Sequence, residues 1–101
     1  MEPFERFQKA NTQDNLWIYI LAIGKNAEIP NEDIRRLIFE KFEFLPGQIL
    51  TARVLYRLMQ DEYIQKEKFQ GKKAYKTTGK GLAELEKMKE FMQELAEKTK
   101  N

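Results

Sequence analysis

Apolar and polar positions along the chain fall into blocks, and several blocks have the periodicity of helices. Residues 1–11 form a short amphipathic lead-in with Phe4 and Phe7 on one side. Residues 16–23 are an almost wholly apolar run, and N-cap candidates precede it between Asn11 and Asp14. A helix that is apolar on nearly every face has to be buried on nearly every face, either in its own core or against a second subunit.

The middle of the chain predicts a short extended piece and a second buried helix. Residues 28–30 are extended, because a residue that precedes proline avoids the helical region. Asn31 can cap a helix that runs to about Phe42, with apolar side chains at the intervals of a buried stripe. This stripe consists of Ile34, Leu37, Ile38 and Phe42.

The next helix follows a turn at residues 45–48 and has two unlike faces. It begins between Gln48 and Thr51 and runs to about Asp61. At 100° per residue, one face is aliphatic, whereas the opposite face is short, polar, aromatic or cationic and has no carboxylate. The aliphatic face is Leu50, Val54, Leu55 and Leu58, and the opposite face is Ala52, Arg53, Tyr56, Arg57 and Gln60. Asp61 and Glu62 stand at the far end, where they oppose the helix dipole.

The C-terminal part of the chain predicts a β-hairpin and a long helix. Two strands, at about residues 63–69 and 73–77, are joined by the tight loop Gln70-Gly71-Lys72, whose glycine adopts positive φ at little cost. Thr78 is the natural N-cap of a helix that runs to about Lys98. A heptad seam runs along this helix, formed by Leu85, Met88, Met92 and Leu95 and widened by Leu82 and Phe91.

This seam predicts a homodimer. A domain of this size already has three helices for its core, so a long helix with a heptad seam is better used between two subunits. The expected interface residues are Leu82, Leu85, Met88, Met92 and Leu95. The apolar helix at residues 16–23 can also contribute to the interface. The alternative is that the long helix packs back on its own domain.

Composition removes most catalytic and metal-binding chemistry. The 101 residues include no cysteine, no histidine and no serine, so the commonest general base and the commonest metal ligands are missing. There is no glycine-rich phosphate loop. We therefore expect a non-enzyme with no catalytic residues, no metal and no cofactor. The longest apolar run is far shorter than the roughly 20 residues that span a bilayer, and the N-terminus has no export signal, so we expect a cytoplasmic protein without a membrane partner.

The positive charge is concentrated in one segment. The whole chain has a net charge of +2, but residues 51–80 carry eight Lys or Arg against three Asp or Glu, a net of +5. The other residues carry ten basic and thirteen acidic side chains, a net of −3. Such a distribution suits a polyanionic partner, although a solvated lysine-rich hairpin would have the same charge.

The basic segment contains a helix followed by a hairpin, an order that favours DNA binding. A helix that enters the major groove needs long hydrogen-bonding side chains and small residues near the bases. A hairpin with Lys72 and Lys73 beside Gly71 can lie along the adjacent minor groove. The expected DNA contacts are Gln48, Thr51, Ala52, Arg53, Tyr56, Arg57 and Gln60 from the helix, and Lys68, Lys72 and Lys73 from the hairpin.

Two segments of the chain resemble a known family. Arg53–Ile64, which reads RVLYRLMQDEYI, resembles the recognition-helix end of PadR-like transcriptional regulators. Lys73–Gly81, which reads KAYKTTGKG, is similar to the second wing strand and the start of the last helix in that family. The resemblance covers about residues 49–95, and its most specific part is Tyr75, Thr78 and Gly81. It implies a winged helix-turn-helix fold, mainly α with a small β-hairpin wing, and a role in transcriptional regulation.

We therefore predict a single winged-helix domain at residues 1–101, with its core at 12–80, a wing at about 63–77 and a dimerisation helix at 78–98. The expected function is sequence-specific binding of double-stranded DNA by a dimeric regulator. The alternatives are a winged-helix protein-interaction or scaffold module and a DNA-bound architectural or replication-terminator-like protein. A small-molecule effector is conceivable but unsupported, and the aromatic residues that would line its pocket are Trp17, Tyr19 and Phe91.

Overall fold

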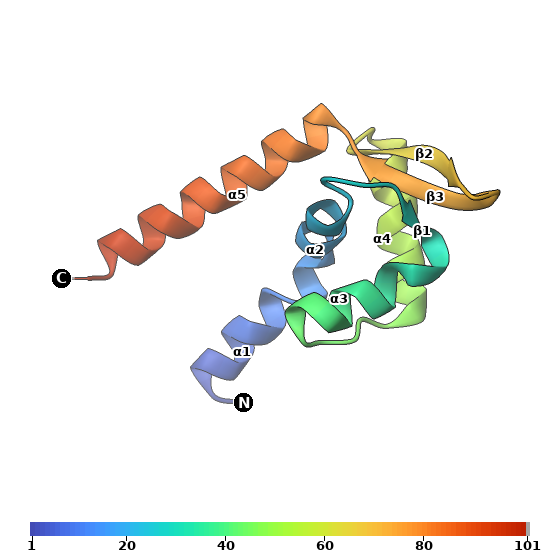
Figure 1. Ribbon diagram of the computed structural model, residues 1–101. Helices are drawn as coiled ribbons and strands as arrows, with labels where there is room; N and C mark the ends of the chain where they lie inside the picture. Colours follow the sequence, from blue (N-terminus) through green and yellow to red (C-terminus); the bar gives the residue numbers. More distant parts are fainter. Residues whose placement is uncertain (101) are drawn as a thin grey trace.

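The helices and strands follow one another in the predicted order. The computed structural model describes residues 1–100. Its elements are α1 (Pro3–Ala10), the 3-10 turn η1 (Gln13–Asn15), α2 (Leu16–Ile23), β1 (Ile29–Pro30), the 3-10 turn η2 (Asn31–Asp33), α3 (Ile34–Phe42), α4 (Gln48–Gln60), β2 (Ile64–Phe69), β3 (Lys72–Thr77) and α5 (Gly79–Lys98). In Figure 1 the hairpin of β2 and β3 projects to one side of the molecule, and α5 extends to the other.

Two helix starts differ from the prediction, because a 3-10 turn precedes each helix. Asn15, the residue before α2, makes no capping hydrogen bond. Its side-chain amide is used elsewhere, since it donates to the Ala10 carbonyl and accepts from the Trp17 indole N–H at 3.2 Å. Asn31 lies in η2 and does not cap α3. The predicted caps at residues 11–14 and at Asn31 are therefore wrong.

The hairpin is tighter than predicted. β2 and β3 are antiparallel with Phe69 opposite Lys72, so only Gln70 and Gly71 form the loop. Both loop residues have positive φ, 53° and 79°, as a two-residue hairpin loop of type I′ requires. Lys72 therefore belongs to the strand and not to the loop. β1 pairs antiparallel with the other edge of β3, which gives the sheet order β1-β3-β2 and confirms the predicted extended piece.

The core is centred on α2, which packs against α3, α4 and α5. Leu16, Ile20 and Leu21 are buried, and the predicted stripe on α3 is confirmed by the burial of Ile34 and Ile38. The remaining α2 side chains are only partly buried, so burial on nearly every face is not reached within one subunit. In the part of the chain described, residues 1–100, no helix combines the length and the apolar character needed to cross a membrane.

Two hydrogen bonds fix the root of the hairpin to α2. The Tyr75 phenol donates to the Ile20 carbonyl at 2.6 Å, and the Thr77 hydroxyl donates to the Leu21 carbonyl at 2.8 Å. The last carbonyls of a helix lack helical partners. The Thr77 hydroxyl supplies a donor to Leu21, while the Ile20 carbonyl accepts from both the Tyr75 phenol and the Gly24 N–H, the latter at 3.3 Å. Burial raises the pKa of the Tyr75 phenol above its ordinary value, because it disfavours the charged form. The phenol is thus a neutral donor inside the core.

The junction between the hairpin and α5 explains the most specific part of the family resemblance. The Thr78 hydroxyl caps α5 as predicted, accepting from the Gly81 N–H at 3.1 Å, and it donates to the Glu62 carbonyl at 2.7 Å. A side chain at Gly81 has no room, since its Cβ would lie 2.3 Å from the Tyr63 carbonyl oxygen. The pattern of Tyr75, Thr78 and Gly81 therefore reflects packing of the hairpin and α5 on the rest of the domain.

α5 has two unlike halves. Leu85 is only 5% exposed, and Met88 packs against the same core, where α5 contacts α2. Phe91 and Leu95 are 66% and 41% exposed, and this half of α5 extends away from the other helices in Figure 1. The prediction that the whole seam faces a second subunit therefore needs a correction. Leu85 is a core residue of its own domain, because the first turns of α5 cover α2.

Candidate nucleic-acid interface

The two faces of α4 lie as its sequence predicted. Leu58 is buried, and the other aliphatic side chains of the inner face are partly buried against the core. The Arg35 side chain donates from Nε to the Pro46 carbonyl at 2.8 Å, which fixes the turn that leads into α4. The outer face is exposed along the whole helix, and it consists of Ala52, Arg53, Tyr56, Arg57 and Gln60. Its polar and cationic groups are therefore available to a partner.

The first turn of α4 differs from the prediction at one residue and adds another. Thr51 is only 5% exposed, and its hydroxyl donates to the Gly47 carbonyl at 2.7 Å. It therefore stabilises the start of the helix and does not join the exposed face. Gln48 is exposed, as expected. Ile49, which the sequence assigned to neither face, is 77% exposed beside it and offers an apolar contact of the kind that recognises a thymine methyl group.

Tyr56 and Gln60 form a pair on the outer face of α4. The Gln60 amide donates from Nε2 to the Tyr56 phenol oxygen at 3.0 Å, and the Tyr56 side chain is 65% exposed. The bond occupies one acceptor site of the phenol and leaves its O–H free to donate. The second amide hydrogen of Gln60 is likewise free. The two side chains therefore present two oriented hydrogen-bond donors.

The hairpin holds a cluster of lysines that have no acidic partner within residues 1–100. Lys66, Lys68 and Lys73 are exposed, and none of them takes part in an ion pair there. Lys68 is directly opposite Lys73 in the β2–β3 register. Like charges in directly opposed positions of a sheet are destabilising. An anion bound between these two strands would relieve that repulsion.

A groove of about 590 Å³ lies between α4 and the hairpin. Ala52 and Tyr56 line it from α4, and Lys68 and Lys73 line it from the hairpin. The structure thus brings together residues from both halves of the predicted interface. Lys66 also lines the groove, as do Asn31, Leu55, Met59, Glu67 and Ala74. The sequence prediction omitted Lys66, although its spacing of two residues from Lys68 places both on the same face of β2.

Arg53 and Arg57 lie outside this groove. Both line a second hollow of about 600 Å³, where Trp17 and Asp61 are among the other lining residues. Neither arginine takes part in an ion pair within the described residues 1–100. Their guanidinium groups therefore remain available to an external anion. The predicted site residues consequently flank α4 on both sides instead of forming a single pocket.

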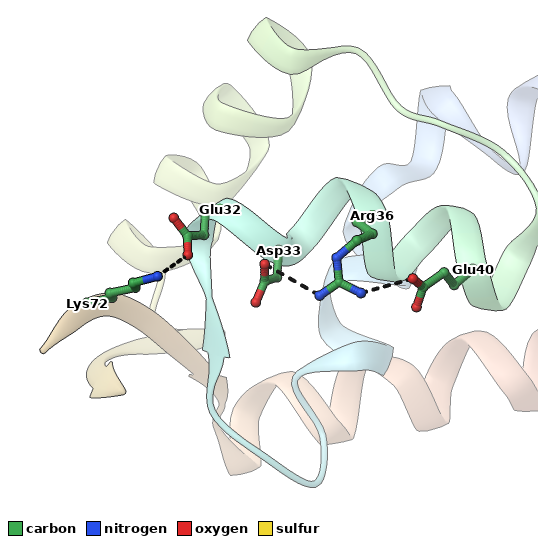
Figure 2. Close-up of polar contacts among 5 residues, drawn as sticks. All are labelled: Glu32, Asp33, Arg36, Glu40 and Lys72. Carbon is green, nitrogen blue, oxygen red and sulfur yellow. Dashed lines mark hydrogen bonds and ion pairs between the residues drawn. The ribbon is translucent and has the colours of Figure 1, made fainter. Parts of the chain in front are cut away.

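Lys72 is bound to an acidic residue from another element. Its Nζ lies 2.6 Å from Oε1 of Glu32, which belongs to η2 (Figure 2). The hydrogen bond to Glu32 raises the pKa of the Lys72 ammonium group. Figure 2 also shows Arg36 between Asp33 and Glu40, at 3.5 and 2.9 Å. Among the predicted hairpin cations, Lys72 is therefore the one that is paired with a carboxylate in the described part of the chain, residues 1–100.

The three aromatic residues considered for an effector pocket do not come together. Tyr19 packs edge-on against Phe42 and Phe44, with ring centroids 4.8 and 4.9 Å apart. Trp17 and Phe91 instead line a different hollow of about 360 Å³ between α2 and α5. Tyr19 is thus a packing residue, because it fills the space beside α3. Across residues 1–100, no three His, Cys, Asp or Glu side chains are grouped to hold a metal ion.

Solved structures of other proteins share this arrangement of helices and hairpin. A PadR-like transcription factor from Bacteroides fragilis has a TM-score of 0.72 at 22% identity, over 92% of this chain and 94% of that chain. F93 from STIV, a winged-helix DNA-binding protein, has a TM-score of 0.70 at 21% identity, over 83% and 92%. This chain has a winged-helix fold.

The winged-helix likeness extends beyond the segment that resembled the family in sequence. A transcriptional regulator from Clostridium thermocellum matches all of this chain and 99% of its own, with a TM-score of 0.68 at 13% identity. The predicted fold is therefore confirmed over the first half of the chain as well as over residues 49–95. No protein-family profile matches the sequence, and no curated protein is significantly similar to it. At these identities the neighbours establish the fold alone.

Proposed function

We propose that this winged-helix protein binds double-stranded DNA sequence-specifically as a homodimer and regulates transcription. The observation that carries the proposal is the exposed face of α4, which bears no carboxylate and two arginines that are unpaired within residues 1–100, beside a hairpin with three exposed lysines that are likewise unpaired there. Among the structural neighbours, one is described as a DNA-binding protein and two as transcription factors or regulators, which supports the same class of function.

In this proposal α4 is the recognition helix and enters the major groove. Arg53 and Arg57 are long enough to reach base edges or phosphates, and the bidentate pairing of arginine with guanine is the commonest specific contact. Tyr56 and Gln60 add hydrogen-bond donors on the same exposed face of the helix. Ala52, with its small side chain, lets the helix backbone approach the bases. Gln48 and Ile49 extend the contact at the N-terminal end of the helix.

The hairpin supplies contacts to the DNA backbone. Lys68 and Lys73 repel each other across the sheet, and a phosphate between them would turn that repulsion into two attractive contacts. Such contacts position a protein on DNA without reading its sequence. Lys66 belongs to the same set because it lines the same groove. Lys72 contributes less, since Glu32 holds its ammonium group at 2.6 Å.

The second half of α5 supplies the proposed dimer interface. Its apolar side chains would be covered if two copies of α5 packed together: Phe91 and Leu95 are exposed and Met92 is half-buried, and the exposed Leu82 in the first turn of α5 can extend the contact. A two-fold axis through this contact would relate two recognition helices. Such dimers read half-sites about 34 Å apart, or a multiple of that distance, in a pseudo-palindromic sequence.

Selection of bound sequences from a random duplex library tests the proposal most directly. We expect enrichment of a pseudo-palindrome, with fluorescence anisotropy then showing tighter binding to the selected duplex than to a scrambled one. The affinity should fall steeply as salt is raised, because phosphate contacts release counterions. Absence of binding to any duplex at about 50 mM salt, where such contacts are strong, would favour the scaffold alternative. Binding without enrichment would favour the architectural one.

A further inference from the structure

The groove between α4 and the hairpin has an apolar floor that contacts with phosphate do not require. Ala52, Leu55 and Met59 line it from α4, and Ala74 lines it from β3. Phosphate is bound by cations and hydrogen-bond donors, and the lysines of the hairpin supply these. The aliphatic floor therefore has a different use. Apolar surface held in a groove favours a ligand that has an apolar part of its own.

The dimensions of the groove suit a small elongated molecule. Its volume of about 590 Å³ falls within the range of roughly 300–1,000 Å³ that is usual for small-molecule sites. From Ala52 to Met59 the floor follows two turns of α4, a length of about 10 Å at 1.5 Å per residue. Leu55 lies midway along this floor and Met59 at its end, where the flexible thioether can adapt to an aliphatic chain.

The charge at the edge of the groove selects an anion. The residues that line the groove include three lysines, Lys66, Lys68 and Lys73, and one acidic residue, Glu67. Lys68 is opposite Lys73 in the strand register. None of the three lysines is paired with a carboxylate within residues 1–100. We infer that the groove binds a long-chain carboxylate, with its tail along α4 and its head group between the lysines.

The same ligand would exclude DNA from the wing side of α4. Tyr56, Lys68 and Lys73 line the groove and also belong to the proposed DNA-binding surface, so one molecule cannot use them for both partners. This competition rests on the proposed function, whereas binding of the carboxylate does not. Regulation would then be direct competition. The ligand occupies part of the DNA-binding surface, and no change in the arrangement of the subunits is required.

Methionine methyl resonances provide a local readout of binding. The chain has four methionines; Met59 lines the groove, whereas Met88 and Met92 lie on α5. With methyl-labelled methionine, titration of the full chain with dodecanoate below its micelle concentration should shift the Met59 resonance and leave the α5 resonances in place. Dodecanol and dodecyltrimethylammonium, which have the same tail with a neutral or cationic head, should shift Met59 at least about tenfold less effectively. Equal shifts with all three, no Met59 shift, or shifts at Met88 and Met92 instead would overturn the assignment.

Two variants separate the head-group contact from general charge effects. The double substitution Lys66→Gln with Lys68→Gln should weaken dodecanoate binding about tenfold, while Lys76→Gln, which removes a hairpin lysine outside the groove, should leave it unchanged. Equal loss in both would show that only overall charge matters and would contradict the proposal. Unshifted Met88 and Met92 resonances in each variant would report that the fold is retained.

The competition is tested separately with labelled duplex DNA. Dodecanoate should release the duplex at the concentrations that shift Met59, and dodecanol should not. If Met59 shifts while the duplex stays bound, the carboxylate site stands and the competition is wrong. If the duplex binds while Met59 never shifts, the ligand proposal fails and the proposed function is unaffected. If no duplex binds in the absence of ligand, the proposed function fails and the methyl titration still decides the site.

Discussion

α4 and α5 are both amphipathic helices with one side in the core, yet their free surfaces are built differently. On α4 the exposed cations, Arg53 and Arg57, have no acidic partner within residues 1–100. On α5 exposed lysines are paired with glutamates three or four residues away, as in Lys87–Glu84 and Lys98–Glu94. Because these charges are balanced within the helix, α5 has little net electrostatic field. The surface of α5 that is suited to a partner is therefore its apolar one. The charge on α4, being unbalanced, attracts a polyanion.

The difference shows that an amphipathic pattern alone does not identify the partner of a helix. Both helices have apolar positions at intervals of three and four residues, and both keep a free side. The partner is decided by which charges are neutralised within the chain and how much apolar surface is left over. On α5 the exposed apolar surface includes Phe91, which is 66% exposed, whereas on α4 the large exposed apolar side chains are Ile49 in the first turn and Tyr56, whose phenol is polar.

The largest expected effect distinguishes the two halves of α5. Leu85→Ala removes a side chain that is 5% exposed, and the free energy of unfolding should fall by about 2–5 kcal/mol. Leu95→Ala makes the same chemical change at a side chain that is 41% exposed, so it should cost much less at low protein concentration. Urea denaturation monitored by circular dichroism measures both. Equal losses in the two variants would contradict the division of α5 into a core half and a free half.

The next effect concerns self-association through the free half of α5. Phe91→Glu places a charge on the apolar surface, and loss of an aromatic anchor from an interface typically costs about 2–4 kcal/mol. We expect the dimer to dissociate at micromolar concentration while the fold is retained, as measured by analytical ultracentrifugation. Lys89→Gln is the matched control, since this side chain lies on the charged surface with Glu86 and should leave the dimer intact. A wild-type protein that sediments as a monomer would refute the dimer proposal itself.

The sequence predicted the elements and the two faces of α4 because both follow from local periodicity. It could not separate Leu85 from Leu95, since both occupy seam positions and only the packing of α5 on α2 distinguishes them. Thr51 was misplaced for a related reason. A short polar residue near a helix start is compatible with solvent, and here it is buried with its hydroxyl satisfied by the Gly47 carbonyl.

Long-range contacts were beyond the reach of periodicity. Glu32 and Lys72 are 40 residues apart, and their ion pair follows from the β1–β3 register, in which Ile29 is opposite Tyr75 and Pro30 is opposite Ala74. Continuing that register places residue 32 opposite residue 72. The two-residue strand β1 sets this alignment, and its sequence alone does not predict that it pairs with β3. The groove depends in the same way on how the hairpin is placed beside α4.

A smaller effect separates the recognition helix from the rest of the basic surface. Arg53→Ala should weaken binding to the selected duplex by about 1–3 kcal/mol and relax the sequence preference at the contacted position. Lys87→Gln on α5 removes the same charge where Glu84 already balances it, and it should change affinity little. Fluorescence anisotropy on selected and scrambled duplexes measures both quantities. If Arg53→Ala weakens both duplexes equally, the arginine contacts phosphate and does not read bases.

The smallest effect concerns Glu32, the one carboxylate within residues 1–100 that forms an ion pair with a hairpin cation. Glu32→Gln should free Lys72 to contact DNA, which raises affinity for random duplex about twofold to fivefold, the range expected of an exposed ion pair. The dependence of log Kd on log salt should steepen by about 0.9, the value for one additional phosphate contact. Both quantities come from anisotropy titrations at a series of salt concentrations.

Glu40→Gln is the matched control for Glu32→Gln, because it changes the net charge equally but removes one of the two carboxylates that hold Arg36 on α3, and leaves the hairpin lysines as they are. An equal gain in affinity from both variants would mean that overall charge, and not the freeing of Lys72, is responsible.

Replacing the hairpin lysines themselves completes the comparison. Lys73→Gln should weaken binding in the wild-type background more than Lys72→Gln does, since Lys73 has no acidic partner within residues 1–100 to give up. The difference in affinity between the Lys73→Gln and Lys72→Gln variants should disappear in the Glu32→Gln background, because both lysines then lack an acidic partner within residues 1–100.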